Sequence, residues 1–301
     1  MKFAAIDIGS NAVRLLLTRV IENGNQPIFK KESLIRIPIR LGEDSFTQRK
    51  ISKEKQENLL KAMNGFRFLM DAYEAVDYIA CATSAMREAE NGNEIVNKIK
   101  KESGINLEII DGRKEAYIIN SNHIEKKLGK NNSYLYIDVG GGSTELTLFS
   151  NDKSITSRSF NIGTVRLLEN LVAKKNWKEM KNWLKENTTQ YQPLIGIGSG
   201  GNINKIFRLS RKKEGSPISY KKIKEIYEFL KTYSLEERIK VLGLRPDRAD
   251  VIIPASEIYL SVMKWGKIKQ MSVPQIGLSD GLIHILYEKY KEKNSLVATA
   301  Q

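Results

Sequence analysis

The stretch that decides the fold is Ile137-Asp138-Val139-Gly140-Gly141-Gly142-Ser143-Thr144-Glu145-Leu146. A similar stretch, Ile6-Asp7-Ile8-Gly9-Ser10-Asn11-Ala12-Val13-Arg14-Leu15, stands 131 positions earlier. In each copy an apolar segment ends in Asp, passes through small residues and resumes as an apolar segment, which predicts a β-hairpin. Its tip exposes backbone amides and small hydroxyls, the groups that converge on phosphate in known loops. Two copies predict two similar domains that face each other across a phosphate-binding cleft.

An ordinary tight hairpin is the alternative for a single copy, and Gly9-Ser10-Asn11 alone fits it equally well. The tip at Gly140-Gly141-Gly142-Ser143 is harder to explain in that way, because three glycines weaken a strand pair without any gain in packing. A matched pair of tips therefore favours phosphate binding.

Length and composition indicate a water-soluble protein of two ordinary domains. The chain has 301 residues, a formal net charge of +14 and no run of about 20 apolar residues, the length that spans a membrane. It opens directly on an expected strand rather than on a signal peptide, and its single Cys81 fits a reducing compartment. These features predict a cytoplasmic location. With only His123 and His284 present, any metal must be bound by oxygen ligands, which favours Mg²⁺ or Mn²⁺.

The positive charge is unevenly placed along the chain. Residues 174–245 hold 17 Lys and Arg against 7 Asp and Glu, a net of +10. Solvated helix faces explain part of this excess, but a local excess also concentrates anions near the surface. Candidate anions are a nucleic acid, an acidic lipid or a phosphate polymer.

Periodicity predicts an α/β chain in which a β-β-β-α-β-α-β-α order is followed by a second β-β-β run and then mostly helices. The polar stretch Gly129-Lys130-Asn131-Asn132 suggests a boundary within 119–132, with domains at 1–119 and 120–301. Expected strands lie in 2–20, 27–39, 76–82, 106–110, 133–139, 143–150, 153–160, 194–197 and 268–271. Expected helices cover 52–73, 93–101, 111–127, 163–173, 175–187, 202–209, 220–233, 235–241 and 248–266.

Two carboxylates, Asp138 and Glu145, flank the second tip. They would repel a bound phosphate unless a cation lay between them, so a Mg²⁺ that bridges carboxylate and phosphate oxygens is expected. Glu115 follows a predicted strand-to-helix turn. It is read either as a first-turn residue that favours the helix dipole or as a general base that deprotonates a water for attack on phosphorus.

Two further clusters complete the candidates. Ala82-Thr83-Ser84-Ala85-Met86-Arg87 places two hydroxyls and a cation at a strand end. Gly196-Ile197-Gly198-Ser199-Gly200-Gly201-Asn202 is a glycine-rich turn before a helix, and helix N-termini after such turns bind anions.

In their order along the chain, these motifs resemble the Ppx/GppA phosphatase family of exopolyphosphatases and guanosine pentaphosphate phosphohydrolases. The resemblance also includes Gly163-Thr164-Val165-Arg166-Leu167, Arg248-Ala249-Asp250-Val251-Ile252 and Gly277-Leu278-Ser279-Asp280-Gly281. It covers essentially the whole chain, in the short form without an appended helical domain. It implies two actin-like, ribonuclease-H-like (ASKHA) domains with the active site in the cleft between them.

The resemblance also implies roles for individual residues. Glu115 matches the catalytic base, and Asp138 and Glu145 match the magnesium-associated carboxylates. The family often has Glu where this chain has Lys114, a cation that lowers the basicity of a neighbouring carboxylate. The matching phosphate-binding positions are Ser10, Asn11, Arg14, Arg87, Gly140, Gly141, Gly142, Ser143, Gly198, Ser199 and Gly200.

These roles lead us to expect an exopolyphosphatase that releases terminal orthophosphate from inorganic polyphosphate with the help of Mg²⁺ or Mn²⁺. Hydrolysis of the guanosine polyphosphate pppGpp to ppGpp is the alternative within the enzyme class, and a kinase is a weaker one because no acceptor pocket is evident. A sensor that binds polyphosphate or nucleotide without turnover is the alternative of another class. No membrane and no specific nucleic acid is expected as a partner, and a homodimer stays open.

Overall fold

The computed structural model describes residues 1–22, 24, 26–122, 132–151 and 153–299. By its internal contacts the chain divides into two compact units. The first comprises Met1–Asn122 and Leu278–Gln301, and the second comprises His123–Gly277. None of the described helices is both long and apolar enough to cross a membrane.

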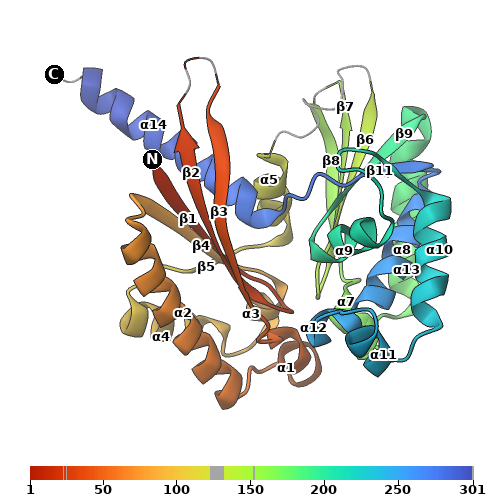
Figure 1. The fold of residues 1–301 in the computed structure, drawn as a ribbon, viewed down its shortest axis with the longest axis horizontal. Coiled ribbons are helices and arrows are strands. Elements are labelled where there is room, and N and C mark those ends of the chain that lie inside the picture. Colours follow the sequence, from red (N-terminus) through yellow and green to blue (C-terminus); the bar gives the residue numbers. More distant parts are fainter. Residues whose placement is uncertain (23, 25, 123–131, 152, 300–301) are drawn as a thin grey trace. The chain divides into compact units, whose positions relative to one another are not determined.

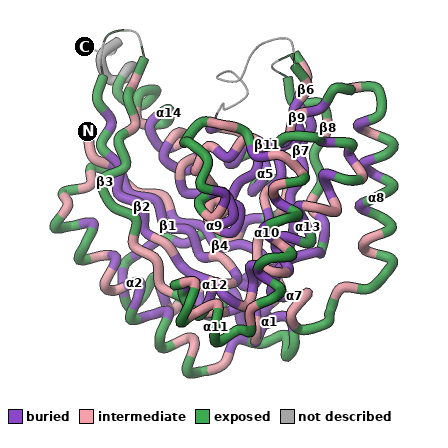
Figure 2. The backbone as a smooth tube through the Cα atoms, turned by 45° about the vertical axis from the view of Figure 1, so that its right-hand side comes forward, coloured by how far each residue is buried: buried purple, intermediate pink, exposed green. Residues whose placement is uncertain are grey.

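The first unit is built on a five-stranded mixed sheet in the order β3-β2-β1-β4-β5 (Figure 1). Its hairpins are antiparallel, whereas β4 and β5 run parallel to β1. The central strands carry the core, as the continuous buried stretches along β1 and β2 in Figure 2 show. The strands are β1 (Lys2–Ile8), β2 (Val13–Ile21), β3 (Ile28–Ile37), β4 (Asp77–Ala82) and β5 (Glu108–Ile109).

Helices pack on this sheet from segments far apart in sequence. One of them, α14, packs on β1, β2 and β4 and against α5, while α2 packs against β2 and α4. The side chain of Ser52 caps α2 by accepting from the Lys55 amide. The helices are α1 (Leu41–Gln48), α2 (Lys53–Tyr73), α3 (Ser84–Glu88), α4 (Gly92–Ser103), α5 (Gly112–Asn120) and α14 (Leu278–Thr299).

The second unit repeats the plan with a six-stranded sheet in the order β10-β11-β9-β6-β7-β8. An apolar cluster that includes Leu135, Ile203 and Tyr259 fills the space between this sheet and its helices. The strands are β6 (Ser133–Val139), β7 (Thr144–Ser150), β8 (Lys153–Phe160), β9 (Leu194–Ser199), β10 (Ile218–Ser219) and β11 (Gln270–Ser272). The helices are α7 (Thr164–Leu168), α8 (Lys174–Thr188), α9 (Gly201–Leu209), α10 (Tyr220–Lys231), α11 (Leu235–Lys240), α12 (Pro246–Ala249) and α13 (Ile252–Trp265), with a 3₁₀ turn at Thr189–Tyr191.

The two sheets share the order of their first four strands when the strands of each unit are counted from its own start. The second sheet then differs, because β11 lies next to β9 and β10 pairs antiparallel with β11 at the edge. In both sheets, a three-stranded antiparallel meander is extended on the side of its first strand by parallel strands. The predicted α/β class with two actin-like domains is therefore confirmed, and the duplicated hairpins are the first two strands of each meander.

The compact units differ from the expected ranges 1–119 and 120–301 at the C-terminal end. The segment from Leu278 onward lies in the first unit, because α14 buries Leu282, Ile283 and Tyr287 against that sheet. The other predicted boundary, within 119–132, falls largely on residues 123–131, which lie outside the described part of the chain.

Candidate active site

Loops of the first unit gather at the edge of the sheet where its parallel strands end. Ile8 of β1 pairs with Ala82 of β4, and Ala82 pairs with Ile109 of β5, so the three strands finish side by side. The residues that follow them belong to three of the sequence motifs. The carboxyl edge of parallel strands is the usual place for ligands in α/β sheets.

Hydrogen bonds from the protein hold the carbonyl groups of the first tip. The Gly9 amide donates to Ala12 O over 3.1 Å, and the Gly42 amide of α1 donates to Ser10 O over 2.8 Å. The buried hydroxyls of Ser10 and Ser84 share a hydrogen bond of 2.9 Å, which joins the tip to the start of α3. The Arg40 amide donates to Asn11 O over 3.1 Å. The first tip is thus a braced turn rather than an open loop.

Arg14 follows the tip on β2 and lies opposite Asp7 of β1. Its Nη1 donates to Asp7 Oδ2 over 2.5 Å. The Asp7 side chain is almost fully buried, while that of Arg14 keeps 28% of its surface exposed. The guanidinium therefore neutralises Asp7 and still reaches solvent, so it can also contact an anion.

Glu115 lies in the first turn of α5, a helix capped by Asp111. The Asp111 carboxylate accepts from the Lys114 amide over 2.7 Å, and this backbone hydrogen bond is the main cause of a lowered pKa at Asp111. Glu115 itself is buried, with 7% of its surface exposed. Its Oε2 lies 4.0 Å from Nη1 of Arg87, and that nitrogen donates to Ile110 O over 2.6 Å. A carbonyl thus fixes Arg87 beside the carboxylate.

The Lys114 ammonium group pairs with a carboxylate other than that of Glu115. Its Nζ lies 2.5 Å from Oε1 of Glu108 in an exposed ion pair. The cation beside Glu115 is therefore Arg87 rather than Lys114, contrary to what the adjacent position in sequence suggested.

The second tip repeats the turn of the first. The Gly140 amide donates to Ser143 O over 2.9 Å, the counterpart of Gly9 and Ala12. The segment that opens α7 holds the tip carbonyls: the Thr164 amide donates to Gly140 O over 3.0 Å, and the Val165 amide donates to Gly141 O over 2.9 Å.

The close contact between the second tip and the segment that opens α7 leaves no room for a side chain at Gly163. A Cβ on Gly163 would lie 2.3 Å from Gly141 O, and Nε of Arg166 donates to Gly142 O over 2.7 Å. Within the described part of the chain, the amides of Gly141 and Gly142 donate to no protein acceptor. The tip therefore has its carbonyls bound and its amides available, as an anion-binding turn requires.

Asp138 and Glu145 occupy paired positions of β6 and β7. Residues directly opposite in an antiparallel pair project from the same face with their Cβ atoms about 5 Å apart. The next strand contributes Ser159, whose hydroxyl donates to Oε1 of Glu145 over 2.7 Å. Glu145 is buried and Asp138 is partly exposed. The second unit thus holds two carboxylates side by side where the first unit holds Asp7 and Arg14.

These oxygen donors fit Mg²⁺. Magnesium is usually bound by one or two carboxylates together with waters and phosphate oxygens, rather than by a cage of protein ligands. Among the described residues, no group of three or more His, Cys, Asp and Glu could hold a metal. Two adjacent carboxylates beside a turn with available amides satisfy the magnesium pattern without such a cage.

The third glycine-rich turn, between β9 and α9, approaches Asp138. Gly200 has a φ of +99°, and a Cβ there would lie 3.1 Å from Asp138 Oδ1. The Tyr259 hydroxyl donates to Ser199 O over 2.5 Å. Burial, and then the nearby Asp138 charge, raise the pKa of Tyr259 well above its usual range, so the phenol stays a donor. Gly198 is a packing position, because a Cβ there would lie 2.5 Å from Met271 Sδ.

Several of these contacts were not among the candidates drawn from the sequence. Ser84, Gly163 and Arg166 lie inside motifs that the sequence already showed, and those motifs are the signal that could have identified them as parts of the site. Nothing in the local sequence pointed to Ser159 or Tyr259, because each reaches the site through packing between distant segments. Cys81, expected to be a buried strand residue, is 2% exposed, and burial raises the pKa of its thiol.

Comparison with known proteins identifies the family. The model of the Ppx/GppA phosphatase family matches residues 21–290. The chain belongs to the Ppx/GppA phosphatase family. The resemblance drawn from the ordered motifs is therefore confirmed.

Individual relatives share the sequence at modest identity. A bifunctional 3-dehydroquinate synthase/phosphatase of Fusobacterium nucleatum is 31% identical over 290 residues, which cover 87% of this chain but only 43% of that protein. This chain thus spans less than half the length of that relative. Exopolyphosphatase 1 of Mycobacterium bovis is 22% identical over 308 residues, covering 94% of this chain and 87% of its own.

Solved structures share the fold. An exopolyphosphatase from Cytophaga hutchinsonii matches with a TM-score of 0.82 at 24% identity, over 96% of this chain and 98% of its own. The type II variant of the Aquifex aeolicus Ppx/GppA phosphatase matches with a TM-score of 0.70 at 24% identity, over 94% and 98% of the two chains.

Proposed function

We propose that the protein is an exopolyphosphatase that releases terminal orthophosphate from inorganic polyphosphate by metal-assisted attack of water. The observation that carries this proposal is the setting of Glu115, a buried carboxylate fixed in the first turn of α5 with Arg87 at 4.0 Å. A protein that only binds phosphate has no need of a buried carboxylate at that place. The family, and relatives named as exopolyphosphatases, support the same reaction class.

In the proposed reaction Glu115 takes a proton from water as the oxygen attacks the terminal phosphorus. The bond from that phosphorus to the bridging oxygen breaks, and the electron pair leaves with the shortened chain. Arg87, whose Nη1 lies 4.0 Å from Glu115 Oε2, would also contact a phosphate oxygen. Such positioned charges act where negative charge moves during phosphoryl transfer.

The two tips supply the binding groups. In the second unit, amides of Gly141, Gly142 and Ser143 would bind phosphate oxygens, Gly140, Ser199 and Gly200 would also bind phosphate, and Gly198 would act through packing. In the first unit, Ser10, Asn11 and Arg14 would bind phosphate. Asp138 and Glu145 would hold Mg²⁺ or Mn²⁺, which when bound neutralises phosphate oxygens and lowers the barrier to attack. A cytoplasmic location stays a prediction of the sequence.

Release of orthophosphate from a substrate panel tests the function. The purified protein is given long-chain polyphosphate, tripolyphosphate and pppGpp, each with Mg²⁺ and with EDTA. We expect the highest kcat/KM with long-chain polyphosphate in Mg²⁺. A preference for pppGpp would assign the guanosine polyphosphate activity instead. Tight binding of polyphosphate without any release would indicate a sensor.

A further inference from the structure

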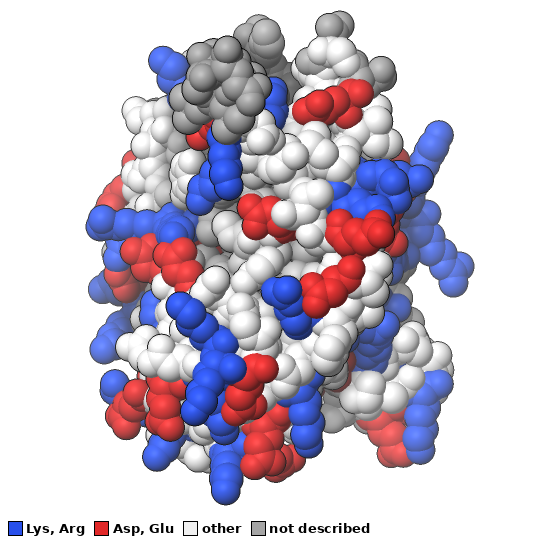
Figure 3. All heavy atoms as spheres, turned by 90° about the vertical axis from the view of Figure 1, so that its left-hand side faces the viewer, with Lys and Arg blue, Asp and Glu red and all other residues white. Residues whose placement is uncertain are grey.

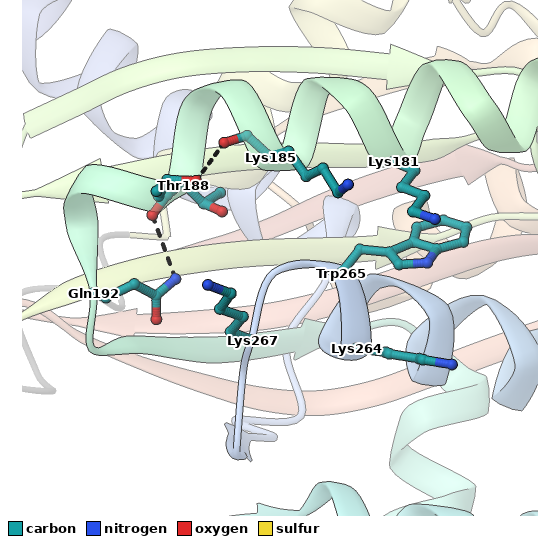
Figure 4. A pocket seen from close by; sticks show the side chains of 8 residues that line it. Lys181, Lys185, Thr188, Gln192, Lys264, Trp265 and Lys267 are labelled. Atoms are coloured by element: carbon teal, nitrogen blue, oxygen red, sulfur yellow. Dashed lines mark hydrogen bonds between the residues drawn. The ribbon is translucent and has the colours of Figure 1, made fainter.

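A basic pocket of about 540 Å³ lies in the second unit, between the end of α8 and the loop that follows α13 (Figure 4). That volume is in the range of ligand-binding pockets. Four of its lining residues are lysines and none is acidic. The residues that line it are Lys181, Lys185, Thr188, Thr189, Gln192, Lys264, Trp265 and Lys267.

The four lysines of this pocket have no carboxylate partner among the residues that the structure describes. Glu179, which lies on the same helix α8, pairs with Arg158 of β8 instead. Lys181 and Lys185 are four residues apart, and like charges at that spacing destabilise a helix. Figure 4 shows Lys181 and Lys185 on α8 along one side, and Lys264, Trp265 and Lys267 on the other. The cluster is thus an unneutralised concentration of positive charge.

Helix capping does not account for these lysines. Two helices end at the pocket, and cations often bind the last carbonyls of a helix. Here uncharged side chains bind such carbonyls: Nε2 of Gln192 donates to Gly266 O over 3.1 Å and to Thr188 O over 3.4 Å. The Thr188 hydroxyl donates to Leu184 O over 2.7 Å. The ammonium groups therefore remain available for a ligand.

The mixed charge of another face gives a contrast. Figure 3, which views the face on the left of Figure 1, shows basic and acidic side chains interspersed. A face of that kind attracts no polyanion in particular, whereas a pocket with four cations and no carboxylate does.

We propose that this pocket binds an internal stretch of a condensed phosphate chain. The assignment of condensed phosphate as the ligand rests on the proposed function. Gln192 lies just before β9, and that strand ends at Ser199, so the pocket and the glycine turn lie at opposite ends of β9. A strand of this length spans about 20 Å. A long chain can reach both places, whereas tripolyphosphate cannot. Holding the chain at a second point raises its effective concentration at the first.

Two matched double variants on α8 test the pocket. Lys181→Gln with Lys185→Gln removes two pocket charges. Lys174→Gln with Lys178→Gln removes two exposed charges at the same spacing on the same helix but outside the pocket. Binding of long-chain polyphosphate is measured by calorimetry at several salt concentrations, in EDTA so that turnover is suppressed. Orthophosphate release is then measured with Mg²⁺ for long-chain polyphosphate and tripolyphosphate.

We expect the pocket variant to bind long-chain polyphosphate roughly tenfold more weakly. Its slope of log affinity against log salt should be smaller by about 1.4, or 0.7 for each lost contact. Its KM for long chains should rise while turnover of tripolyphosphate is unchanged. Equal losses of affinity in the two variants, or no binding by the wild type, would overturn the proposal that this pocket binds polyphosphate. Loss of binding confined to the pocket variant, in a protein without turnover, would support the pocket and contradict the proposed hydrolysis.

Discussion

Asp138 lies directly opposite Glu145 in the hairpin of β6 and β7, whereas Asp7, its counterpart in the first unit, lies opposite Arg14. One duplicated position thus carries a neutralised pair in the first unit and two like charges in the second. Ion pairing at 2.5 Å explains why Asp7 is tolerated at 4% exposure. Two adjacent carboxylates of this kind suit a divalent cation, so we expect a metal to bind there.

Removal of metal should abolish hydrolysis. We expect EDTA to stop orthophosphate release and Mg²⁺ or Mn²⁺ to restore it. Asp138→Asn should raise the Mg²⁺ concentration for half-maximal rate by about tenfold or more, because one charged oxygen ligand is lost. Asp71→Asn, at an exposed ion pair with Arg67 on α2, is the matched control and should leave that concentration unchanged. Full activity in EDTA, with no metal found by elemental analysis, would refute the metal role.

The second tip should depend on the absence of a side chain at Gly163. In Gly163→Ala the new Cβ meets Gly141 O at 2.3 Å, so the tip must move, which we expect to destabilise the fold by about 1–3 kcal/mol. Orthophosphate release should fall in parallel through a higher KM. Gly65→Ala is the control: it lies inside α2 with nothing near its Cβ, and should stabilise the helix by about 0.5–1 kcal/mol. Urea unfolding gives both values, and a Gly163→Ala protein as stable and active as Gly65→Ala would contradict the bracing of the tip.

The cap of the helix that carries Glu115 should weaken in acid. The folded state lowers the pKa of Asp111, chiefly through its hydrogen bond from the Lys114 amide. A carboxylate with a lowered pKa stabilises the fold above its unfolded pKa of about 4, and this contribution is lost as the pH falls through the folded value. The hydrogen-exchange protection factor of the Lys114 amide should therefore fall below pH 4.

Two comparisons isolate this effect. The Lys222 amide, which the neutral Ser219 hydroxyl caps at 3.2 Å on α10, should keep its protection over the same range. In Asp111→Asn the Lys114 amide should stay protected and lose its pH dependence. Parallel pH profiles for Lys114 and Lys222 would show that the Asp111 carboxylate does not hold the start of α5.

Local patterns in the sequence predicted much of the fold. The paired hairpins and the strand at 194–197 were expected and are present, the strand as Leu194–Ser199. The meander and the parallel strands after it follow from hydrophobic runs separated by turn residues. Periodicity over these short segments is decided by neighbours in sequence, so a single sequence is enough to find them.

Other elements depend on contacts that no local pattern reveals. A single helix was expected over 248–266, but the structure has α12 and then α13, which starts at Ile252. The expected helix 163–173 ends at Leu168. Helix α1 and the C-terminal α14 were not predicted. Parts of the candidate site also depend on such contacts, because the hydroxyls of Ser159 and Tyr259 donate to residues 14 and 60 positions away.

The most direct measurement of the central claim is orthophosphate release from long-chain polyphosphate by Glu115→Gln. The control is Glu108→Gln, the same chemical change at the exposed partner of Lys114 six residues earlier. Both are assayed at saturating Mg²⁺, with polyphosphate binding measured alongside. Loss of a general base lowers a rate by about 10²–10⁴. We predict that kcat of Glu115→Gln falls at least a hundredfold while polyphosphate still binds, and that Glu108→Gln stays near the wild-type rate. Near-normal turnover by a folded Glu115→Gln protein would contradict the account.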